Sequence, residues 1–387
     1  MSRSPRETKP GWLSRAALAV WSAAALFVVP GCVSQRLSKA VVEAPNQRDV
    51  LWVLRPENAA VLAHNDRLYR PAWRVPVGPP AAELAVAVIE PGDYQLAVSI
   101  KTGKSKNGKA HVWPQSDWKL PDSPGSMAVQ PKGTVLVLHG YGDSRENMVH
   151  WALHLAQQGY RAVLVDLRGH GRSTGNWIGY GAFEAADLRQ VIDDLERRNL
   201  LAGRLGVVGL SYGASVGLQF AGADERVAAV VALEPFSDPR TAIVEFARAT
   251  VPRLVGGWKQ ADFDRTIDAA GRLGDVDWAA ADILGAVERM RAPVLYVVAS
   301  DDRLISPEHT RRLAERTRSP HAVMEVKFND AGDIPPHVLL AWLLDPAAPL
   351  ALRWLDEALL RPGSDLGERL QALTAAPAPE PAAAVSN

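Results

Sequence analysis

The chain has 387 residues, with 43 basic and 43 acidic side chains and an apolar fraction of 47%. This charge balance gives no electrostatic reason to expect a nucleic-acid partner. The apolar fraction suits a globular protein with a large core, and the length suits one large α/β domain with additional segments. The single cysteine, Cys32, excludes a disulfide within the chain.

Residues 1–32 have the pattern of a secretory signal peptide. A basic start is followed by the apolar run AALAVWSAAALFVVP, which ends at Gly31-Cys32. The run of about 15 residues is short for a bilayer-spanning helix, which needs roughly 20, although a single uncleaved anchor is the alternative. The stretch VVPGC resembles a bacterial lipobox, which implies that Cys32 is lipidated and tethers an exported protein to a membrane of the cell envelope.

The rest of the chain divides by composition. We expect residues 33–80 to be a spacer and N-terminal extension, residues 81–374 to form an α/β domain, and the Ala/Pro-rich residues 375–387 to be a flexible tail. Within the domain, residues 237–289 interrupt the alternation of strands and helices. An insertion of this length is typical of a cap over a pocket, and a plain helical connection is the alternative.

From about residue 84, short apolar segments alternate with segments of helical periodicity. The stretch LAVAVIEPGDYQLAVSI predicts two strands around a turn at PGD. Six further strands are predicted at GTVLVLHG, RAVLVDLRG, RLGVVGLS, VAAVVALEPF, APVLYVVAS and HAVMEVKFN. Apolar strands separated by helices predict a mostly parallel sheet that is covered on both faces. We therefore expect functional residues at the carboxyl ends of these strands.

A candidate nucleophile, Ser211, follows the third of these six strands. Gly209 and Gly213 flank it in a G-x-S-x-G motif between a β run and a helix. A serine in this motif occupies a sharp turn, where side chains two positions away on either side would collide. The N-terminus of the following helix favours negative charge that develops at the same place. A glycine-rich packing turn with an incidental serine is the alternative.

Here the sequence resembles the α/β-hydrolase fold family, most closely its esterase, lipase and serine-aminopeptidase-like branch. The resemblance covers about residues 84–360 and rests on LVLHGYGDSREN, DLRGHGRSTG, GLSYGAS and VLYVVASDDRLISP. It implies an α/β-hydrolase fold with a small helical cap. It also implies that the backbone N–H groups of Tyr141, in the H-G-x-G stretch, and Tyr212 bind an oxyanion. His139 is then a structural neighbour, and the RGHGRSTG loop packs under the pocket.

An imidazole base needs a carboxylate that orients it and stabilises its charge. The family's pattern selects Asp302, which precedes Arg-Leu-Ile after APVLYVVAS. Successive residues leaving a strand point in opposite directions, so only one of the two adjacent aspartates is expected to face the site. Asp301 is the second choice. Glu234, after the preceding strand, is the third. Aspartates that only cap a turn are the alternative.

The family places the base after the last strand, in the order small residue, glycine, histidine. This chain has Ala331, Gly332 and Asp333 there, and His337 follows four positions later. If the loop is longer than usual, His337 reaches the serine. If the loop is ordinary, Asp333 stands at the base position, where an ordinary aspartate pKa near 4 makes it a poor base at neutral pH. We expect His337 to be the base.

The sequence therefore predicts an exported, lipid-anchored serine hydrolase with the triad Ser211, His337 and Asp302. The expected substrate is a small carboxylic ester cleaved through an acyl-enzyme, with a thioester or a peptide as alternatives. A non-catalytic lipoprotein of the same fold that binds a ligand or partner is the competing class, because the histidine is displaced. No metal cluster or nucleotide loop is apparent in the sequence, so no cofactor is expected.

Overall fold

The structure is a computed structural model of the chain. It describes residues 30–47, 59–104, 110–120, 130–302, 304–328, 336–342 and 344–375. The predictions for the signal peptide before residue 30 and for the tail after residue 375 lie outside the described residues. Among the residues that the structure describes, no helix is both long and apolar enough to span a bilayer.

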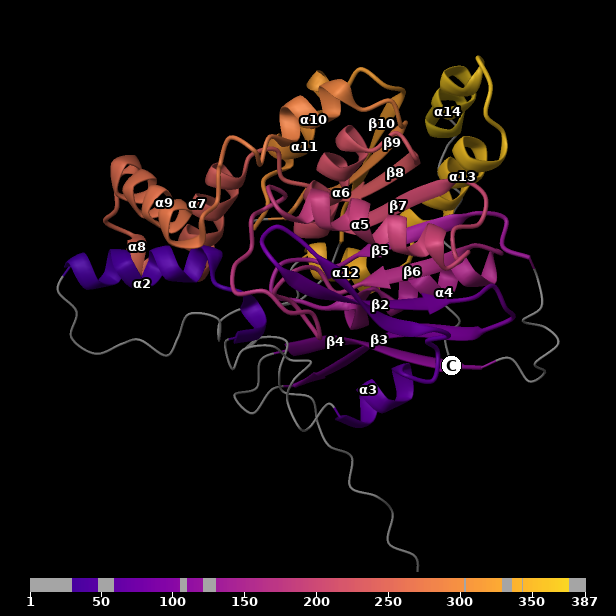
Figure 1. The fold of residues 1–387 in the computed structure, drawn as a ribbon, viewed down its shortest axis with the longest axis horizontal. Helices are drawn as coiled ribbons and strands as arrows, with labels where there is room; N and C mark the ends of the chain where they lie inside the picture. The colour runs from indigo at the N-terminus through magenta and orange to yellow at the C-terminus, as the bar shows by residue number, and fades with distance from the viewer. Residues whose placement is uncertain are drawn as a thin grey trace, which may run out of the picture.

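Eight strands form one sheet in the order β1-β2-β6-β5-β7-β8-β9-β10 (Figure 1). The pairs β1–β2 and β2–β6 are antiparallel, and every other pair is parallel. The strands are β1 (Ala72–Val77), β2 (Ala82–Ile89), β5 (Thr134–Leu138), β6 (Arg161–Val165), β7 (Leu205–Leu210), β8 (Val227–Leu233), β9 (Val294–Ala299) and β10 (His321–Val326). The mostly parallel sheet and its six predicted strands are confirmed.

The two strands predicted around the turn at PGD are present, but the second does not pair with the first. Strand β3 (Gln95–Lys104) is present, but it pairs antiparallel with β4 (Ala110–Lys119) in a separate two-stranded sheet. Both edges of β2 are already used, one by β1 and the other by β6. Strand β3 therefore has no edge of β2 to pair with.

Helices cover both faces of the sheet, because successive residues of each buried strand point to opposite sides. In β5, Leu136 and Leu138 belong to one core cluster, and Val135 and Val137 belong to the other. The first face is covered by α5 (Glu184–Arg197), α6 (Tyr212–Ala223), α10 (Ile283–Arg289) and α11 (Pro307–Arg316). The second face is covered by α4 (Val149–Gln157), α12 (Pro336–Trp342), α13 (Ala347–Leu360) and α14 (Leu366–Ala375).

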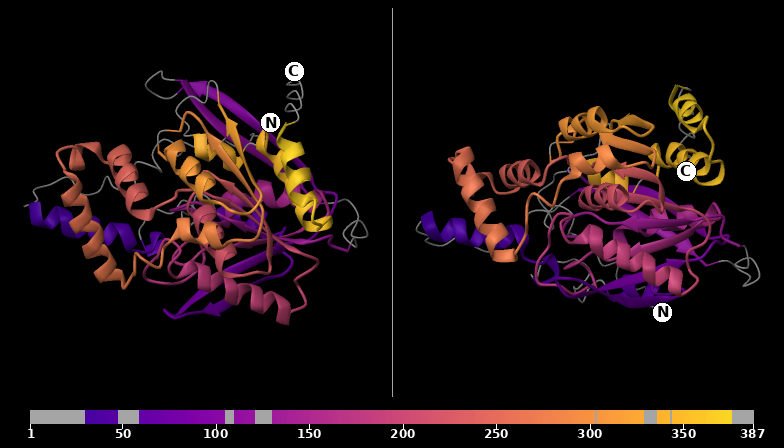
Figure 2. Two further views of the ribbon diagram at one scale, coloured as in Figure 1. Left: turned by 90° about the horizontal axis from the view of Figure 1, so that it is seen from above. Right: turned by 45° about the horizontal axis from the view of Figure 1, so that its top comes forward.

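A helical cap projects from one end of the sheet and consists of α7 (Pro239–Thr250), α8 (Pro252–Val255) and α9 (Gln260–Gly274) (Figure 2). These three helices lie within the predicted insertion 237–289 and are called the cap below; whether they cover a pocket or form a plain helical connection stays a prediction. The last helix of that range, α10, packs on α6, where a Cβ added to Gly222 would lie 2.6 Å from Ala286 O. Helix α10 therefore belongs to the layer that covers the sheet.

The range 33–80, predicted to be a spacer and extension, contains structured elements. Helix α2 (Pro30–Val42) packs along α9, where Leu37 joins the apolar cluster of the cap (Figure 1). The 3₁₀ helix η1 (Pro45–Gln47) and the helix α3 (Ala59–Asn65) follow, and then β1 enters the main sheet. The sheet therefore begins before residue 81, and α2 completes the cap. The positions of β1 and α2 are determined by packing between segments that are distant in the sequence, and no local sequence pattern predicts them.

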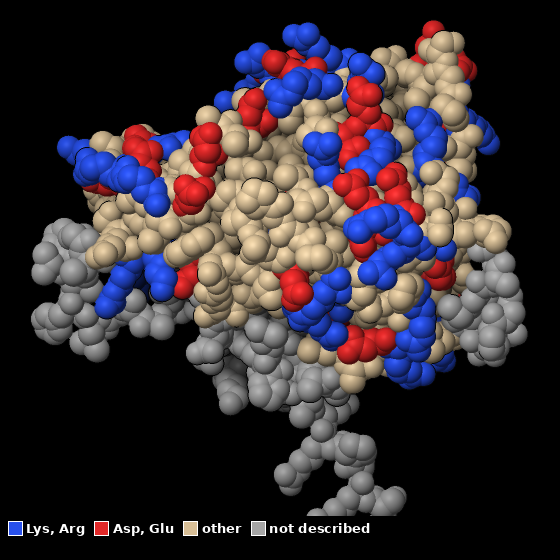
Figure 3. All heavy atoms as spheres, viewed as in Figure 1, with Lys and Arg blue, Asp and Glu red and all other residues tan. Residues whose placement is uncertain are grey.

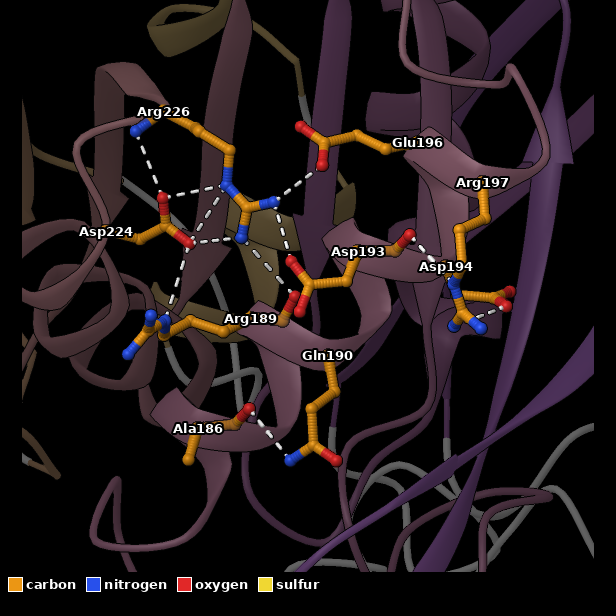
Figure 4. Close-up of polar contacts among 9 residues, drawn as sticks. All are labelled: Ala186, Arg189, Gln190, Asp193, Asp194, Glu196, Arg197, Asp224 and Arg226. Carbon is orange, nitrogen blue, oxygen red and sulfur yellow. Dashed lines mark hydrogen bonds and ion pairs between the residues drawn. The ribbon is translucent and has the colours of Figure 1, made fainter.

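Acidic and basic side chains are interspersed on the face seen in Figure 3. One network of them, shown in Figure 4, ties α5 to the turn between α6 and β8. The Arg226 guanidinium lies 2.5 Å from Asp224, 2.7 Å from Asp193 and 3.0 Å from Glu196. These pairs fix the outer surface of the helical layer, away from the carboxyl ends of the strands.

Candidate active site

Ser211 stands at the carboxyl end of β7, between that strand and α6. Its backbone is in the left-handed region, with φ 49° and ψ −110°, which L-residues other than glycine rarely adopt. The Ser211 N–H donates to Leu233 O at 2.7 Å, and the Ser211 carbonyl accepts the first turn's N–H from Ser215 at 3.0 Å. The residue is half-buried, so its side chain keeps access to solvent. This is the strained strand-to-helix turn that the motif predicts.

The two glycines of the motif are required by close approach. A Cβ on Gly209 would lie 2.5 Å from Gly213 O, and a Cβ on Gly213 would lie 2.5 Å from His139 O. Both distances are shorter than real Cβ contacts, and the opposing atoms belong to the backbone. The sharp turn at Ser211 therefore tolerates no side chain at either position, so the motif has a steric cause in this chain.

The loop after β5 lies directly beside Ser211. A Cβ built on Gly140 would be 3.9 Å from the Ser211 Cβ. Gly142 has φ +68°, so the loop bends through a conformation that suits glycine. The 140–142 loop and the N-terminus of α6 thus meet at the candidate nucleophile, as an oxyanion site requires.

His139 supports this loop and is unsuited to be the base. Its Nε2 accepts the N–H of Leu167 at 2.9 Å, so the proton is on Nδ1, which donates to Gly140 O at 2.8 Å. Burial lowers the pKa of His139 to about 4, which keeps the ring neutral. Both ring nitrogens are used to hold backbone, in agreement with the structural role that the resemblance implied.

The side chains of Tyr141 and Tyr212 hold in place the backbone whose N–H groups are proposed to bind the oxyanion. The Tyr212 hydroxyl is fully buried and donates to Glu184 Oε1 at 2.8 Å. The Tyr141 ring lies 6.2 Å from the Tyr212 ring and contacts Phe246 of the cap edge to face at 5.8 Å. Sequence analysis missed Glu184 and Phe246, because each comes from a helix distant in sequence from the residue it supports.

Asp302 lies in the turn after β9 and is buried. Its Oδ1 accepts the N–H of Leu304 at 2.5 Å and that of Ile305 at 3.2 Å. These bonds orient the carboxylate and are those of an aspartate that caps a turn. Its role as the triad acid stays a prediction.

Two further carboxyl groups lie near Asp302. Asp301 has a buried Oδ1 without a hydrogen-bond partner among the described residues. Glu234 follows β8, is fully buried, and accepts the Ala299 N–H with Oε1 at 2.5 Å. Burial, with the charges of Asp302 and Asp301 adding to it, raises the pKa of Glu234 to about 9. Glu234 is therefore uncharged near neutral pH, which argues against the third choice of acid.

His337 is the second residue of α12, and the structure describes its backbone only. Helix α12 packs against α4 and against β7, the strand that ends at Ser211. Leu340 O accepts the Trp151 Nε1–H at 2.9 Å, and Leu340 is fully buried. Asp333 and the rest of the loop 329–335 lie outside the described residues. Both alternatives for the base, a long loop with His337 or an ordinary loop with Asp333, therefore stay predictions.

Other histidine side chains that the structure describes are engaged elsewhere. His170 Nδ1 is 2.8 Å from Arg168 O, and His321 Nδ1 is 3.0 Å from Ser319 O, near the end of β10 opposite the site. His150 stacks on Trp342 of α12 with ring centroids 4.6 Å apart.

A second polar group, which sequence analysis missed, joins the cap to the turn beside the acid. His309 Nδ1 accepts the Ser237 N–H at 3.1 Å and lies 2.9 Å from Ser237 Oγ. His309 Nε2 is 3.2 Å from Glu245 Oε2 on α7. Ser237 and His309 are buried, and they come from the β8–α7 connection and from α11. Only the folded chain brings these three residues together.

Comparison with known proteins agrees with this fold. Residues 133–283 match a family model described as alpha/beta hydrolase fold. The uncharacterized protein YqkD of Bacillus subtilis is 28% identical over 197 residues, which cover 49% of this chain and 62% of that relative. The Pyrococcus furiosus esterase PF2001 has a similar structure, with a TM-score of 0.51 and 18% sequence identity over 76% of this chain and 94% of that one.

The chain therefore has the α/β-hydrolase fold, in which a mostly parallel eight-stranded sheet carries helices on both faces. The fold expected from the resemblance is confirmed. Ser211 occupies the position at the end of a central strand where such folds place a nucleophile. The candidate site thus comprises Ser211, the loop 140–142 beside it and the predicted acid turn at Asp302, with the Phe246 ring of α7 against Tyr141.

Proposed function

We propose that this chain is a serine hydrolase that cleaves a carboxylic ester through an acyl-enzyme intermediate. The observation that carries the proposal is the strained turn at Ser211, with φ 49° and with the Gly140 backbone beside it. Backbone strain of this kind persists only where the surrounding structure imposes it, and it concentrates at functional sites. In a turn that served only packing, glycine could occupy this position at a lower conformational cost than serine.

The first step forms a bond between Ser211 Oγ and the carbonyl carbon of the ester, while the serine proton moves to His337. Negative charge develops on the carbonyl oxygen, and the backbone N–H groups of Tyr141 and Tyr212 bind it. The C–O bond to the alcohol then breaks, and the alcohol leaves with the proton from His337. Water repeats the sequence and releases the acid.

Asp302 orients His337 and stabilises the imidazolium that forms in each step. Its support is the pair of backbone N–H groups from Leu304 and Ile305, which hold Oδ1. Asp301, the preceding residue, has no such bonds to its buried Oδ1 among the described residues. Phe246 and Tyr141 contribute aromatic surface between the cap and the oxyanion loop, which favours an apolar acyl group over a charged one.

The test is hydrolysis of short-chain and medium-chain p-nitrophenyl esters by wild type and by Ser211→Ala, with Ser364→Ala as an exposed serine control. We expect Ser211→Ala to lower kcat by several orders of magnitude and Ser364→Ala to match wild type. A thioester and a peptide p-nitroanilide compared at equal concentration decide between the substrate classes. Equal activity of Ser211→Ala and wild type would reject the assignment.

We further propose that Cys32 carries a lipid that holds the protein on a membrane of the cell envelope. The support is its place at the end of an apolar run in the sequence and in the first turn of α2, the helix that packs on the cap. A lipid there would hold the cap side of the molecule towards the membrane. Cys32→Ser is expected to move the protein to the soluble fraction or to leave it unprocessed. Membrane fractionation at unchanged mass would indicate an uncleaved helix instead.

A further inference from the structure

Glu234 lies between the strand of the proposed nucleophile and the strand of the proposed acid. The residue before it, Leu233, accepts the Ser211 N–H through its carbonyl at 2.7 Å. On the other side, the Glu234 N–H donates to Val297 O at 2.8 Å. Its φ is 51°, so the chain is in the left-handed region at the ends of two neighbouring strands, once at Ser211 and once at Glu234. A conformation that only glycine adopts at low cost needs a reason when a glutamate occupies it.

The side chain supplies that reason. Glu234 is fully buried, and its Oε1 accepts the N–H of Ala299 at 2.5 Å. Ala299 is the last residue of β9, and the turn with Asp301 and Asp302 begins two residues later. The bond therefore joins the ends of β8 and β9 at the place where the acid turn leaves the sheet.

The charge state of Glu234 follows from its surroundings. No cationic side chain pairs with it among the described residues, and its Oε2 has no hydrogen-bond partner there. The ionisable groups that act on it, Asp301 and Asp302, both lie on the turn after β9 and are acidic. A buried carboxylate beside two other carboxylates is costly, so the group holds its proton. Burial, with the two aspartates adding to it, raises its pKa to about 9.

We propose that Glu234 is a positioning residue of the site: its uncharged carboxyl fixes the end of β9 through Ala299 and thereby sets where Asp302 stands relative to Ser211. This inference rests on the proposed function of that site. It assigns Glu234 a role distinct from the triad acid, which must be ionised to stabilise an imidazolium. An amide can replace the carboxyl, since its oxygen also accepts an N–H, whereas a methyl group cannot.

The experiment compares Glu234→Gln, Glu234→Ala and Asp302→Asn in the full chain, with kcat and KM measured from pH 6 to 10.5 on a p-nitrophenyl ester. We expect Glu234→Gln to keep kcat within about 3-fold of wild type, and Glu234→Ala to lose roughly 10-fold or more in kcat with KM little changed. Asp302→Asn is expected to lose more than either. The wild-type rate is expected to decline above about pH 9, where Glu234 ionises, and Glu234→Gln to lack that decline.

Two results would overturn the proposal. Loss of activity in Glu234→Gln as large as in Asp302→Asn would make Glu234 the triad acid. Full activity in Glu234→Ala would show that nothing in the site depends on it.

A second readout does not require activity. The infrared difference spectrum of wild type minus Glu234→Gln at pH 7 is expected to show the carbonyl band of a protonated carboxyl. Other buried carboxyl groups, such as Asp143, whose pKa burial raises to about 7, contribute equally to both spectra. The raised pKa predicts that the stability contributed by the protonated group is fully present below about pH 4.5 and is lost as pH rises towards 9. Glu234→Gln should not show this loss in urea unfolding.

The two readouts separate the possible failures. Without hydrolysis and without labelling of Ser211, the proposed function fails. The infrared band and the unfolding curves then still decide whether Glu234 is an uncharged carboxyl that fixes β9. If the band is missing from the difference spectrum of wild type minus Glu234→Gln, the inference is wrong whatever the activity.

Discussion

Gly213 of α6 faces the carbonyl oxygen of His139 so closely that a Cβ on Gly213 would lie 2.5 Å from it. This approach brings the helix that follows Ser211 against the loop proposed to bind the oxyanion. The nucleophile and the oxyanion loop are therefore positioned by one backbone contact, and a single methyl group at Gly213 tests it.

Gly213→Ala should destabilise the fold by roughly 1–3 kcal/mol and lower ester hydrolysis at least 10-fold, because the loop or the helix must move. Gly257→Ala is the matched control, since nothing lies within 4 Å of a Cβ there. Urea unfolding and kcat/KM are the measurements. Identical behaviour of the two variants would refute the contact.

Phe246→Ala should alter substrate preference more than stability. The Phe246 ring contacts Tyr141 edge to face at 5.8 Å and connects the cap to the oxyanion loop. Removing it is expected to raise KM for medium-chain esters by about 2- to 10-fold, since such aromatic contacts contribute roughly 0.5–1.5 kcal/mol. The KM for acetyl esters should change less. Phe246→Leu should give KM values between those of wild type and Phe246→Ala. An equal change for all chain lengths would contradict a pocket at this contact.

His309→Ala distinguishes a structural histidine from a base. Its Nδ1 accepts the buried Ser237 N–H, which would lose its partner in the variant. We expect a loss of roughly 1–3 kcal/mol in unfolding free energy, with ester hydrolysis retained within a few-fold. Should the purified and folded variant be inactive, His309 would replace His337 as the candidate base.

Arg226→Ala should lower stability without affecting hydrolysis, because the network in Figure 4 lies away from the site. Burial would raise the pKa of Asp224, but hydrogen bonds from Arg226 outweigh it and hold that pKa below its ordinary value. A lowered carboxyl pKa contributes stability above about pH 4, which is lost as pH falls through the folded value. The deficit, about 1–2 kcal/mol at pH 7, should therefore shrink below pH 4.

Arg291→Ala is the control for this network, since Arg291 and its partner Glu225 are both strongly exposed. Its effect on unfolding should be close to zero. An Arg226→Ala deficit that is independent of pH would show that packing of the arginine stem, and not its charge, carries the contribution.

Local patterns were sufficient for most strands of the sheet and for the sharp turn at Ser211. Six apolar runs matched strands β5 to β10. For β5 to β9 the reason is that a strand buried on both faces has few polar residues. Gly209, Ser211 and Gly213 could be interpreted because the turn requires those residue types within five positions. The position of the 140–142 loop followed from the same family pattern.

The parts that sequence could not supply depend on contacts between distant segments. Nothing within α2 indicates that it packs on α9, because any amphipathic helix could use that face. Ser237, His309 and Glu245 have no spacing that joins them. Glu234 was considered only as an acid, and its uncharged state results from burial and from two neighbouring aspartates that only the folded chain brings close.

The most direct test of the central claim is the rate at which a fluorophosphonate probe labels the protein, with the labelled peptide identified by mass spectrometry. We predict fast labelling on Ser211, none in Ser211→Ala, and labelling slowed by at least 100-fold in His337→Ala, because triad residues act as a unit. Asp333→His in the His337→Ala background should not restore it. No labelling of the folded wild type would place the chain among non-catalytic α/β-hydrolase-like proteins. Fast labelling of His337→Ala, or its recovery by Asp333→His, would contradict His337 as the base.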